Sequence, residues 1–361
     1  MSDELEFDAN GPVLLVGGYG TVGAELARLA APSLPLLLTG RSVERGRDLA
    51  AATGAALRVW DLSDPAPFRA RVRAVVSAVN DPDDRVLRAA IVGGAPLVDI
   101  TRWTARLQRA ATVAAMLNPV APVLLSSAWM GGVTSLVAAH LAEELGGADT
   151  VEVAIRWDLR DRAGADSVEF MDRLGLDYEV VQDGQRHTIM PLTDSRRVRI
   201  GDTLTRVARI DTPEQFTLPL TLGAVTAATR IGFSSAASTS ALLAVKRLGF
   251  FRWGRGDCFT GARRALLYAP GAGGTAQVRV DVTRDGLTRR AVVTDPAGQA
   301  HLTAVGAFLG VRRVLGLDGA PAANGVRFPE QTPVPSHVPD ALAAYGVETR
   351  IDTVIATGRA A

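Results

Sequence analysis

The stretch that decides the fold lies near the N-terminus and reads Val13-Leu14-Leu15-Val16-Gly17-Gly18-Tyr19-Gly20-Thr21-Val22-Gly23. Four consecutive apolar residues that end at a glycine are typical of a strand buried on both faces. After them, Val22, Leu26, Leu29 and Ala30 recur at the spacing of a helix with one buried face. The glycines between these two elements follow the pattern G-x-G-x-x-G, in the strand–turn–helix context that gives this pattern its meaning.

This glycine pattern predicts a loop that binds a pyrophosphate. Gly18 permits the tight turn, Gly20 lets the backbone approach the phosphates, and Gly23 lets helix and strand pack closely. The N–H groups at the start of the helix then face the phosphates. We therefore expect a dinucleotide against Gly18, Tyr19, Gly20, Thr21 and Val22. The alternative is a structural turn in a similar fold that binds nothing.

The end of the second strand favours NADP(H) over NAD(H). An NAD enzyme usually carries Asp or Glu about 20 residues after the glycines, where it binds the ribose 2′-hydroxyl. Here the sequence reads Thr39-Gly40-Arg41-Ser42. Arg41 suits a charge-assisted contact with a 2′-phosphate and Ser42 a hydrogen bond, with Arg45 one helical turn further on. Asp61, after the third strand, is either an adenine contact or a turn residue.

Strands and helices alternate through the first third of the chain. Apolar runs predict further strands at 36–39, 57–60, 74–79, 97–100 and 123–125. Helical patterns are expected between them, one capped by Ser42 and ending at Gly54, one opening at Asp64-Pro65, and others at 82–93 and 105–117. Such alternation predicts an α/β fold, a Rossmann-type doubly wound parallel sheet with helices on both faces, over residues 1–132.

After a helix expected at 133–145, the pattern of apolar residues changes to the alternation typical of half-exposed strands. Val151, Val153 and Ile155 alternate with polar residues, as in a half-exposed strand. Two further strands flank Arg284-Asp285-Gly286, which is a hairpin signal. Residues 133–318 are therefore expected to form a second, α+β domain with an open mixed sheet. The proline-rich tail 319–361 is expected to pack back on the first domain, and the serine-rich run 234–238 is either a lid or a helix cap.

Polar residues at the predicted carboxyl ends of the strands are the candidates for chemistry, because ligands of such sheets bind there. Ser77, Ala78, Val79 and Asn80 are expected to form a wall beside the nicotinamide ribose, together with Thr101.

Three residues near these strand ends are candidate catalytic groups. Asp99 either relays a proton or caps the next segment, and Arg102 either clamps a substrate carboxylate or lies on the surface. Trp129 and its counterpart Trp103 either wall the pocket or serve packing.

The second domain offers a charged group for substrate binding. Arg156, Asp158 and Arg160 fall on one face if the strand that starts near Val151 continues through them. On that basis Arg156 and Arg160 are expected to bind a carboxylate and Asp158 to act in catalysis, in a cleft shared with the first-domain strand ends. The alternative is a solvated charged edge. Tyr178 and His187 are isolated acid–base candidates.

Composition narrows the functional classes. The 361 residues suffice for two domains, and a formal charge of +1 gives no overall attraction to nucleic acid or to an anionic membrane. Cys258 is the only cysteine, and the four histidines lack metal-ligand spacing, so neither a disulfide nor a metal is expected. The acidic, polar start of the chain is unlike a secretory signal, and no apolar run reaches membrane-spanning length, so we expect a cytoplasmic protein.

The glycine loop and the Thr39-Gly40-Arg41 sequence resemble those of the saccharopine dehydrogenase-like (saccharopine reductase-like) NADP-binding family. Further similar stretches are Val75-Val76-Ser77-Ala78-Val79-Asn80, Pro96-Leu97-Val98-Asp99-Ile100-Thr101, Trp129-Met130-Gly131-Gly132-Val133-Thr134-Ser135, Asp295-Pro296-Ala297-Gly298-Gln299-Ala300-His301-Leu302-Thr303-Ala304 and Gly325-Val326-Arg327-Phe328-Pro329-Glu330. The resemblance covers both ends of the chain and is poor between about residues 160 and 265. Gly131 also stands where many relatives carry proline.

This resemblance implies an NADP-dependent oxidoreductase that reduces an imine, or oxidises a secondary amine, of a small amino-acid-derived substrate. Two other classes remain open: a carbonyl or enoyl reductase, for which Phe216, Phe233, Phe250 and Phe251 would line an apolar channel, and a non-catalytic NADP-binding regulator. A homodimer that associates through the second domain is the expected assembly.

Overall fold

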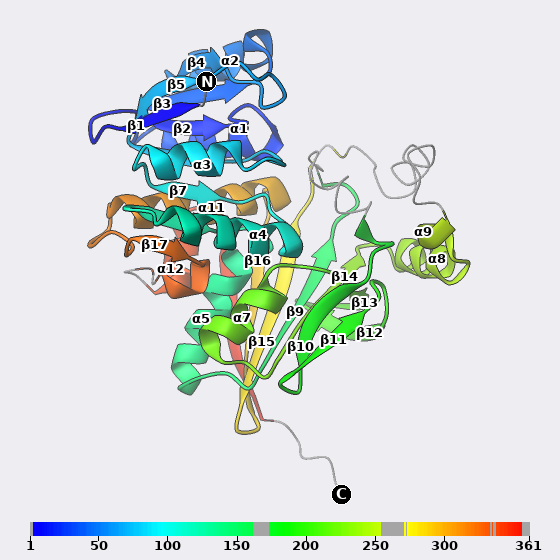
Figure 1. Cartoon of the computed structure of the whole chain (residues 1–361). Coiled ribbons are helices and arrows are strands. Elements are labelled where there is room, and N and C mark those ends of the chain that lie inside the picture. Colours follow the sequence, from blue (N-terminus) through cyan, green and yellow to red (C-terminus); the bar gives the residue numbers. More distant parts are fainter. Residues whose placement is uncertain are drawn as a thin grey trace, which may run out of the picture. The chain divides into compact units, whose positions relative to one another are not determined.

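The computed structural model of the chain describes residues 3–161, 173–253, 271, 273–332, 334 and 337–355. The chain forms two compact units (Figure 1). The first unit comprises Met1–Val133 and Ala300–Ser336, and the second comprises Thr134–Gln299 and His337–Ala361. No helix in the described part of the chain is both long and apolar enough to cross a membrane.

The first unit contains a seven-stranded parallel sheet with the strand order β17-β8-β7-β6-β2-β3-β4. Its strands are β2 (Val13–Val16), β3 (Leu36–Gly40), β4 (Ala56–Val59), β6 (Ala74–Ser77), β7 (Leu97–Asp99), β8 (Pro122–Leu125) and β17 (Gly325–Arg327). The chain order reverses beside β2, which lies between β3 and β6. This switch point is where ligands bind in doubly wound sheets, and the glycine loop begins there.

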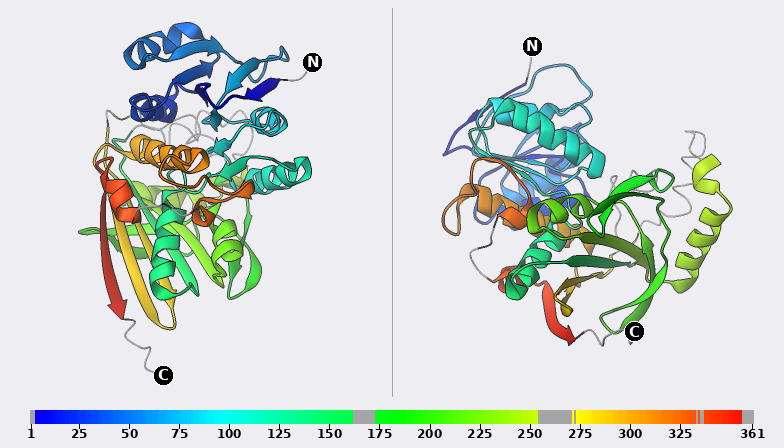
Figure 2. Two further views of the ribbon diagram at one scale, coloured as in Figure 1. Left: turned by 90° about the vertical axis from the view of Figure 1, so that its left-hand side faces the viewer. Right: turned by 60° about the horizontal axis from the view of Figure 1, so that its bottom comes forward.

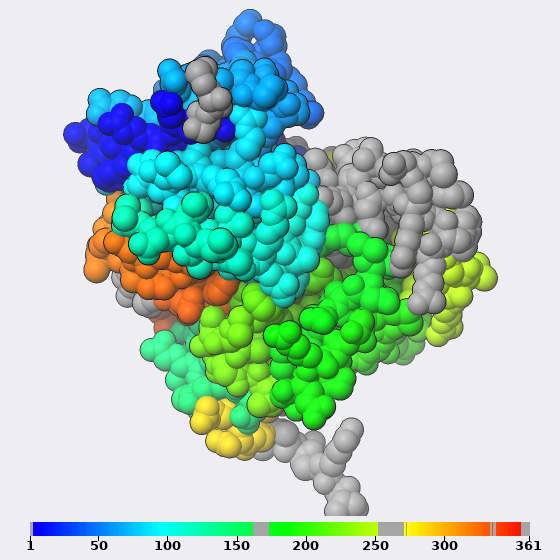
Figure 3. All heavy atoms as spheres, in the orientation of Figure 1, coloured from blue at the N-terminus to red at the C-terminus, as the bar shows by residue number. Residues whose placement is uncertain are grey.

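Helices lie on both faces of this sheet (Figure 2). They are α1 (Thr21–Ala30), α2 (Val43–Thr53), α3 (Arg85–Val92), α4 (Thr104–Leu117) and α11 (Gln299–Leu315). Each buries one side, as Leu26, Ala27 and Ala30 do in α1. Figure 3 shows the outer surface of α3 and α4 in the orientation of Figure 1. The predicted doubly wound α/β fold is therefore confirmed.

The helix predicted at Asp64-Pro65 is wrong. This segment is a loop, followed by β5 (Arg69–Val72), which pairs in parallel with β1 (Glu4–Phe7). The loop carbonyls turn toward one guanidinium: Arg85 Nη1 donates to the carbonyl oxygens of Leu62 (2.9 Å) and Asp64 (2.5 Å). A helix would direct these carbonyls along its own axis, so the long-range contact with Arg85 outweighs the local proline signal.

The second unit contains a mixed seven-stranded sheet with the order β12-β13-β14-β9-β15-β16-β18, in which only β14 and β9 are parallel. Its strands are β9 (Thr150–Trp157), β12 (Arg196–Ile200), β13 (Thr203–Arg209), β14 (Thr226–Phe233), β15 (Ala276–Arg284), β16 (Leu287–Asp295) and β18 (Glu348–Ile355). The hairpin predicted at Arg284-Asp285-Gly286 joins β15 to β16. Asp285 and Gly286 have φ values of +49° and +78°, as a two-residue turn of this kind requires.

The two faces of this sheet differ in chemistry. Val151, Val153 and Ile155 of β9 are buried on one face, alongside the paired residues Val278 and Val280 of β15. The opposite face carries charged side chains between apolar ones. The sheet curls toward this face (Figure 2). Ile200 of β12 and Val207 of β13 pack there against Ala154 of β9. Charged groups on this face are therefore partly enclosed.

The remaining elements of the second unit surround this sheet. They are the hairpin β10 (Tyr178–Gln182) and β11 (Gln185–Ile189), and the helices α5 (Val133–Leu145), α7 (Glu214–Leu222), α8 (Ala236–Arg247), α9 (Phe250–Trp253) and α12 (Val338–Ala343). Of the lid and the cap considered for 234–238, the structure shows a cap, because Ser235 Oγ accepts a hydrogen bond from Ser238 N at 3.2 Å. Cys258 lies outside the described residues.

The predicted domain boundaries need correction at the C-terminal end. Residues 300–336 group with the first unit and 337–361 with the second, whereas a single tail from 319 was expected on the first domain. Pairing of β17 with β8 explains the first assignment, and pairing of β18 with β16 explains the second. Within the first unit, Arg313 of α11 holds the following turn by donating to Pro329 O (3.0 Å) and Thr332 Oγ1 (2.5 Å). Burial lowers the pKa of Arg313 to about 10.

Candidate functional site

The glycine loop is built as the sequence pattern requires. Gly17 leaves β2 with a φ of +79°, and the amides of Gly17 and Gly18 both donate to Thr39 O of the neighbouring strand (2.9 and 3.1 Å). A Cβ atom on Gly23 would lie 2.2 Å from Gly17 O. The chain's own packing therefore demands glycine at Gly17 and Gly23, because only glycine permits this helix to approach this strand.

Gly20 differs from these two glycines. Its backbone (φ −71°, ψ 175°) is one that any residue adopts, and it is the N-cap of α1. A Cβ atom there would meet only Gly17 O, at 3.2 Å, and the residue is exposed. The first turn of α1 carries no acidic residue and its cap supplies no side-chain hydrogen bond. The loop thus presents a bare, electropositive helix end, which fits a pyrophosphate.

Tyr19 fixes the neighbouring end of β3. Its ring lies so close to Gly40 and Gly46 that a Cβ atom on either glycine would come within 2.7 Å of it. The tyrosine hydroxyl accepts a hydrogen bond from Ser42 N at 2.8 Å. The glycine loop and the segment predicted to choose the cofactor are therefore held together by one side chain.

Arg41 and Ser42 follow this contact and begin α2. Arg41 is exposed at the end of β3. The Ser42 hydroxyl donates to Glu44 Oε2 at 2.7 Å, and this hydrogen bond is the main reason that the pKa of Glu44 is lowered. The acidic residue next to the predicted 2′-phosphate position is thus Glu44, and a phosphate must compete with it for Ser42. The sequence-based prediction did not consider this residue.

Asp61 caps a turn after β4. Its Oδ1 accepts hydrogen bonds from Ser63 N (3.0 Å) and Ser63 Oγ (2.7 Å), which together lower the pKa of Asp61. Of the two roles considered for Asp61, the structure shows the turn. An adenine contact through this carboxylate stays a prediction.

At the carboxyl end of β6, the residues that follow Ser77 reach the surface and Ser77 itself does not. Ser77 is fully buried within the sheet, and its Oγ has no hydrogen-bond partner among the described residues. Ala78 and Val79 are half-buried and Asn80 is exposed. Thr101 Oγ1 donates to Val79 O at 2.7 Å, which ties this segment to the loop after β7. Of the residues predicted to lie beside the nicotinamide, Ala78, Val79, Asn80 and Thr101 are at least partly accessible and Ser77 is not; their contact with the cofactor stays a prediction.

Asp99 and Arg102 bind each other in the interior. Arg102 Nε donates to Asp99 Oδ2 at 2.7 Å, and only 3% of the Arg102 side chain is exposed. Its other nitrogens approach Asp84 Oδ1 (2.5 Å) and Asp81 Oδ2 (3.5 Å). Burial alone would lower the pKa of Arg102, but the charge of Asp99 and hydrogen bonds to Asp99 and Asp84 raise it.

This network corrects both roles considered for Arg102. The residue is not on the surface, and its buried guanidinium is already paired with three carboxylates, so a substrate carboxylate would have to displace one of them. Asp81 also accepts hydrogen bonds from Arg85 N (2.8 Å) and Val86 N (3.0 Å) at the start of α3, and burial raises its pKa. The Asp81-Pro82-Asp83-Asp84 run was the available sequence signal for this network, and the prediction missed it.

Trp129 stands in a glycine loop that is packed against α11. The loop places Met130, Gly131 and Gly132 at φ values of +57°, +61° and +93°. A Cβ atom on Gly131 would lie 2.5 Å from Thr303 O. Since proline is confined to φ near −65°, this conformation explains why glycine stands where relatives carry proline. Trp129 itself is half-buried, and its predicted role in the pocket stays a prediction.

Of the residues predicted to bind substrate in the second unit, Arg156 keeps spare hydrogen-bonding capacity. It lies on the charged face of β9, where Nη1 donates to Gln277 Oε1 at 3.1 Å. Its Nε is buried and has no partner among the described residues. Neighbouring Arg230 is instead paired with Glu152 (3.4 Å) and Asp194.

Asp158 and Arg160 are not on one face with Arg156, because β9 ends at Trp157 and the chain turns. Arg160 pairs with both carboxylate oxygens of Asp158 (3.4 and 3.1 Å). Burial alone would raise the pKa of Asp158, but hydrogen bonds from Arg160 and Thr275 lower it. Asp158 therefore stays ionised and holds the turn after β9, and its predicted part in catalysis stays a prediction.

Tyr178 and His187, the two isolated acid–base candidates, lie on the paired strands β10 and β11, and an acid–base role for either stays a prediction. Tyr178 is buried in β10, and burial raises its pKa above the ordinary value. His187 is exposed on the paired strand β11.

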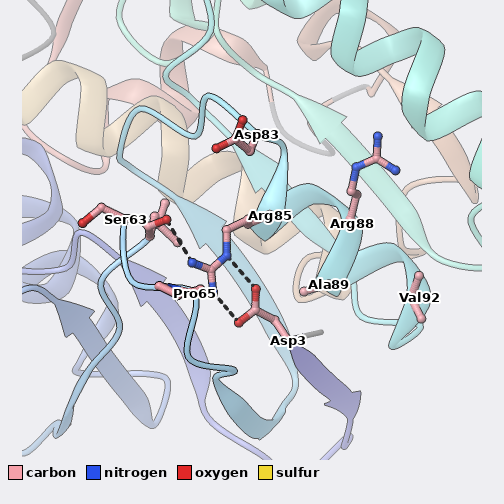
Figure 4. Close-up of a pocket in the computed structure, with 9 residues that line it drawn as sticks. Asp3, Ser63, Pro65, Asp83, Arg85, Arg88, Ala89 and Val92 are labelled. Atoms are coloured by element: carbon pink, nitrogen blue, oxygen red, sulfur yellow. Dashed lines mark hydrogen bonds and ion pairs between the residues drawn. The ribbon is translucent and has the colours of Figure 1, made fainter. Parts of the chain in front are cut away.

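An open pocket of about 470 Å³ lies on the first unit, apart from the glycine loop (Figure 4). Arg85 points into it and binds Asp3 with Nε (2.9 Å) and Nη2 (2.8 Å). The lining residues are Asp3, Leu62, Ser63, Pro65, Asp83, Arg85, Arg88, Ala89 and Val92. Arg85 already binds the N-terminal segment and the 62–66 loop, and no residue of the glycine loop lines this pocket, so it does not belong to the predicted dinucleotide site.

Comparison with known proteins identifies the fold. No protein-family model matches the sequence. No curated protein matches it either. Among solved structures, saccharopine dehydrogenase (L-Glu forming) from Saccharomyces cerevisiae matches with a TM-score of 0.68 and 12% identity, over 95% of this chain and 100% of that one. The chain therefore has a saccharopine dehydrogenase-like fold, as the sequence resemblance implied.

Two further structures match with lower scores. C. glutamicum DAP dehydrogenase in complex with DAP has a TM-score of 0.43 at 13% identity, over 93% of this chain and 99% of that one. An engineered D-amino acid dehydrogenase bound to NADP⁺ has a TM-score of 0.41 at 12% identity, over 95% and 99%.

Proposed function

We propose that this protein is an NADP(H)-dependent oxidoreductase that reduces an imine, or oxidises a secondary amine, of a small amino-acid-derived substrate. Two findings support a nicotinamide enzyme: the glycine loop at the switch point of the parallel sheet, and the saccharopine dehydrogenase-like fold. When bound, the nicotinamide supplies or accepts the hydride, and the protein has to position the substrate carbon and manage one proton.

The observation that carries the proposal is the contrast between Gly20 and Gly23. Gly23 is required by packing within the chain, since its Cβ would lie 2.2 Å from Gly17 O. Gly20 is not, since its backbone is extended and its Cβ would meet a single atom at 3.2 Å. A glycine that the fold does not need, at the bare start of α1, is accounted for by a ligand that approaches the backbone there.

Arg41 supports the choice of NADP(H). It is exposed directly after β3, where an NAD enzyme carries an acid. Glu44 works in the opposite direction, because its carboxylate holds the Ser42 hydroxyl at 2.7 Å. A 2′-phosphate brings stronger acceptor oxygens and pairs with Arg41, so we expect Ser42 to exchange Glu44 for the phosphate when NADP(H) binds.

We assign recognition of a substrate carboxylate to Arg156. Among the three arginines predicted for this task, Arg102 is surrounded by carboxylates and Arg160 is paired with Asp158, whereas Arg156 contacts the uncharged Gln277. Arg156 has no carboxylate partner among the described residues, so it can pair with an acid without breaking an ion pair. Asp99 and Asp158 each face an arginine, so we assign proton transfer to neither.

Cofactor titration followed by turnover tests the proposal. We expect NADPH to bind more tightly than NADH in a fluorescence titration, and NADPH to be consumed with cyclic or N-alkyl imines of amino acids. Arg156→Gln should then lower kcat/KM on a carboxylated imine about tenfold or more, while the matched control Arg160→Gln stays near wild type. Tight NADPH binding without turnover of any imine, ketone or enoyl substrate would identify a regulator instead, and turnover confined to acyl substrates would identify an enoyl reductase.

A further inference from the structure

Two histidines and a glutamate that are far apart in the sequence meet within the second unit. His140 and Glu144 lie one turn apart on α5, and His337 directly precedes α12 (Figure 1). Each side chain offers one ligand atom, and these atoms all lie within 4.8 Å of one another. The two imidazole rings meet edge to face, with centroids 4.2 Å apart. The spacing of the histidines along the chain gave no sign of this group.

His140 is the buried member of the group. Only 10% of its side chain is exposed, and its Nε2 is buried without a hydrogen-bond partner among the described residues. That nitrogen points toward Glu144 Oε1 at 3.5 Å. A buried imidazole nitrogen without a hydrogen-bond partner is available as a ligand for a cation.

The surroundings orient the other two groups. Arg289 Nε donates to Glu144 Oε2 at 2.7 Å, which leaves Oε1 turned toward His140. Asp340 Oδ2 lies 3.9 Å from His337 Nδ1. Metal-bound histidines and carboxylates are commonly fixed by such outer contacts, which set the ring orientation and the ligating oxygen.

We propose that His140, Glu144 and His337 bind a divalent transition-metal ion of the zinc class. Two imidazoles and one carboxylate form a nitrogen and oxygen donor set that suits Zn²⁺, whereas Mg²⁺ and Ca²⁺ prefer oxygen ligands alone. Bonds of about 2.0–2.1 Å in a tetrahedral site place ligand atoms about 3.4 Å apart. Only a small inward movement is needed, and the side chains of His337 (49% exposed) and Glu144 (29% exposed) have room to make it.

The ion would connect α5 to the start of α12, which packs on β18. It would therefore secure the C-terminal part of the second unit to its core. Since Arg289 offsets the charge of Glu144, we expect affinity on the order of micromolar and not the far tighter binding of thiolate sites. This site goes beyond the proposed redox function and does not depend on it.

The experiment uses the full chain without a polyhistidine tag, stripped of metal by chelation. Zn²⁺ is titrated calorimetrically, Co²⁺ is followed by its visible absorption, and melting temperatures are recorded with and without Zn²⁺. We expect one Zn²⁺ per chain and a rise of roughly 5 °C at a hundredfold excess over Kd, with no response to Mg²⁺. His337→Ala and Glu144→Gln should each weaken binding at least tenfold, and His187→Ala, on the exposed strand β11, should not.

Either of two results would overturn the proposal. The first is wild-type protein that shows no stoichiometric Zn²⁺ binding at micromolar to tens of micromolar concentrations. The second is Zn²⁺ binding that survives unchanged in both His337→Ala and Glu144→Gln, which would place the ion elsewhere. Both substituted side chains are partly exposed, so loss of folding does not confuse the comparison, and the melting temperature without Zn²⁺ checks this for each variant.

Discussion

Replacing Gly20 by valine tests whether this glycine is required for folding or for binding of the dinucleotide. The wild-type backbone at Gly20 has φ −71° and ψ 175°, which valine adopts without strain. Its Cβ would meet one atom, Gly17 O at 3.2 Å, which requires a shift of a few tenths of an ångström, and the position itself is exposed. We therefore expect Gly20→Val to fold normally and to lose the dinucleotide.

The size of each effect follows from these contacts. An apolar residue at a helix N-cap is less favourable than glycine by about 1 kcal/mol at most, which corresponds to roughly 2–4 °C in a unit of this size. The valine side chain, in contrast, occupies the position of the pyrophosphate. Losing one or two charge-assisted hydrogen bonds from the helix end costs about 3 kcal/mol, so Kd for NADPH should rise at least a hundredfold.

Gly23→Ala is the matched control, since its Cβ would lie 2.2 Å from Gly17 O and the backbone itself would have to move. We expect it to unfold at a clearly lower temperature with or without cofactor, by about 1–3 kcal/mol. Thermal unfolding and fluorescence titration of both variants with NADPH decide the matter. A folded Gly20→Val protein that still binds NADPH with wild-type affinity would show that this loop is not the phosphate site.

Three further perturbations test neighbouring parts of the argument. Arg41→Ala should weaken NADPH binding about tenfold to a hundredfold and leave NADH unchanged in parallel titrations; an equal loss for both cofactors would remove Arg41 from the 2′-phosphate site. Glu44→Gln should tighten NADPH about two- to fivefold by releasing Ser42, whereas Asp48→Asn on the same helix should not. Arg102→Gln should cost about 3–5 kcal/mol in urea unfolding at pH 7, because Asp81 and Asp99 lose this buried cation and Asp84 keeps only the more exposed Arg109. Since burial raises the pKa of Asp81, this carboxyl takes up a proton at a higher pH than an exposed aspartate does. The stability deficit of Arg102→Gln should therefore shrink in acid, and a constant deficit would contradict the proposed network.

The fold was predictable from the sequence where local and long-range signals agree. The run Val13–Val16, the periodic helix after it and the Asp285-Gly286 turn each predict the structure that forms. One element for which these signals disagree is the helix predicted at Asp64-Pro65, which does not form. Its capping signal is local and worth about 1 kcal/mol, whereas Arg85 makes several contacts to the same segment from a distant helix. No pattern within the segment itself contains that information.

The candidate site was predictable as a region but not as a set of contacts. Strand ends in a parallel sheet converge, so Ala78, Asn80 and Thr101 were correctly expected near one edge. The position of Ser77, one residue earlier, already turns its side chain into the sheet. The metal-ligand group illustrates the same limit more strongly, because His140 and His337 meet only after two long segments have folded.

The high arginine content of the chain makes it difficult to predict from the sequence which arginine binds a substrate. All but one of the 39 lysine and arginine residues are arginine, so the presence of an arginine does not by itself indicate an anion-binding site. The partners of each side chain in the structure separate arginines that the sequence does not: Arg102 is paired with Asp81, Asp84 and Asp99, whereas Arg156 donates to the uncharged amide of Gln277. A guanidinium already neutralised would have to break an ion pair before it could bind a substrate, and it regains little by doing so. Arg156, which has no carboxylate partner among the described residues, loses no ion pair when it binds an acid, and for that reason the acidic-substrate hypothesis now depends on Arg156 alone of the three.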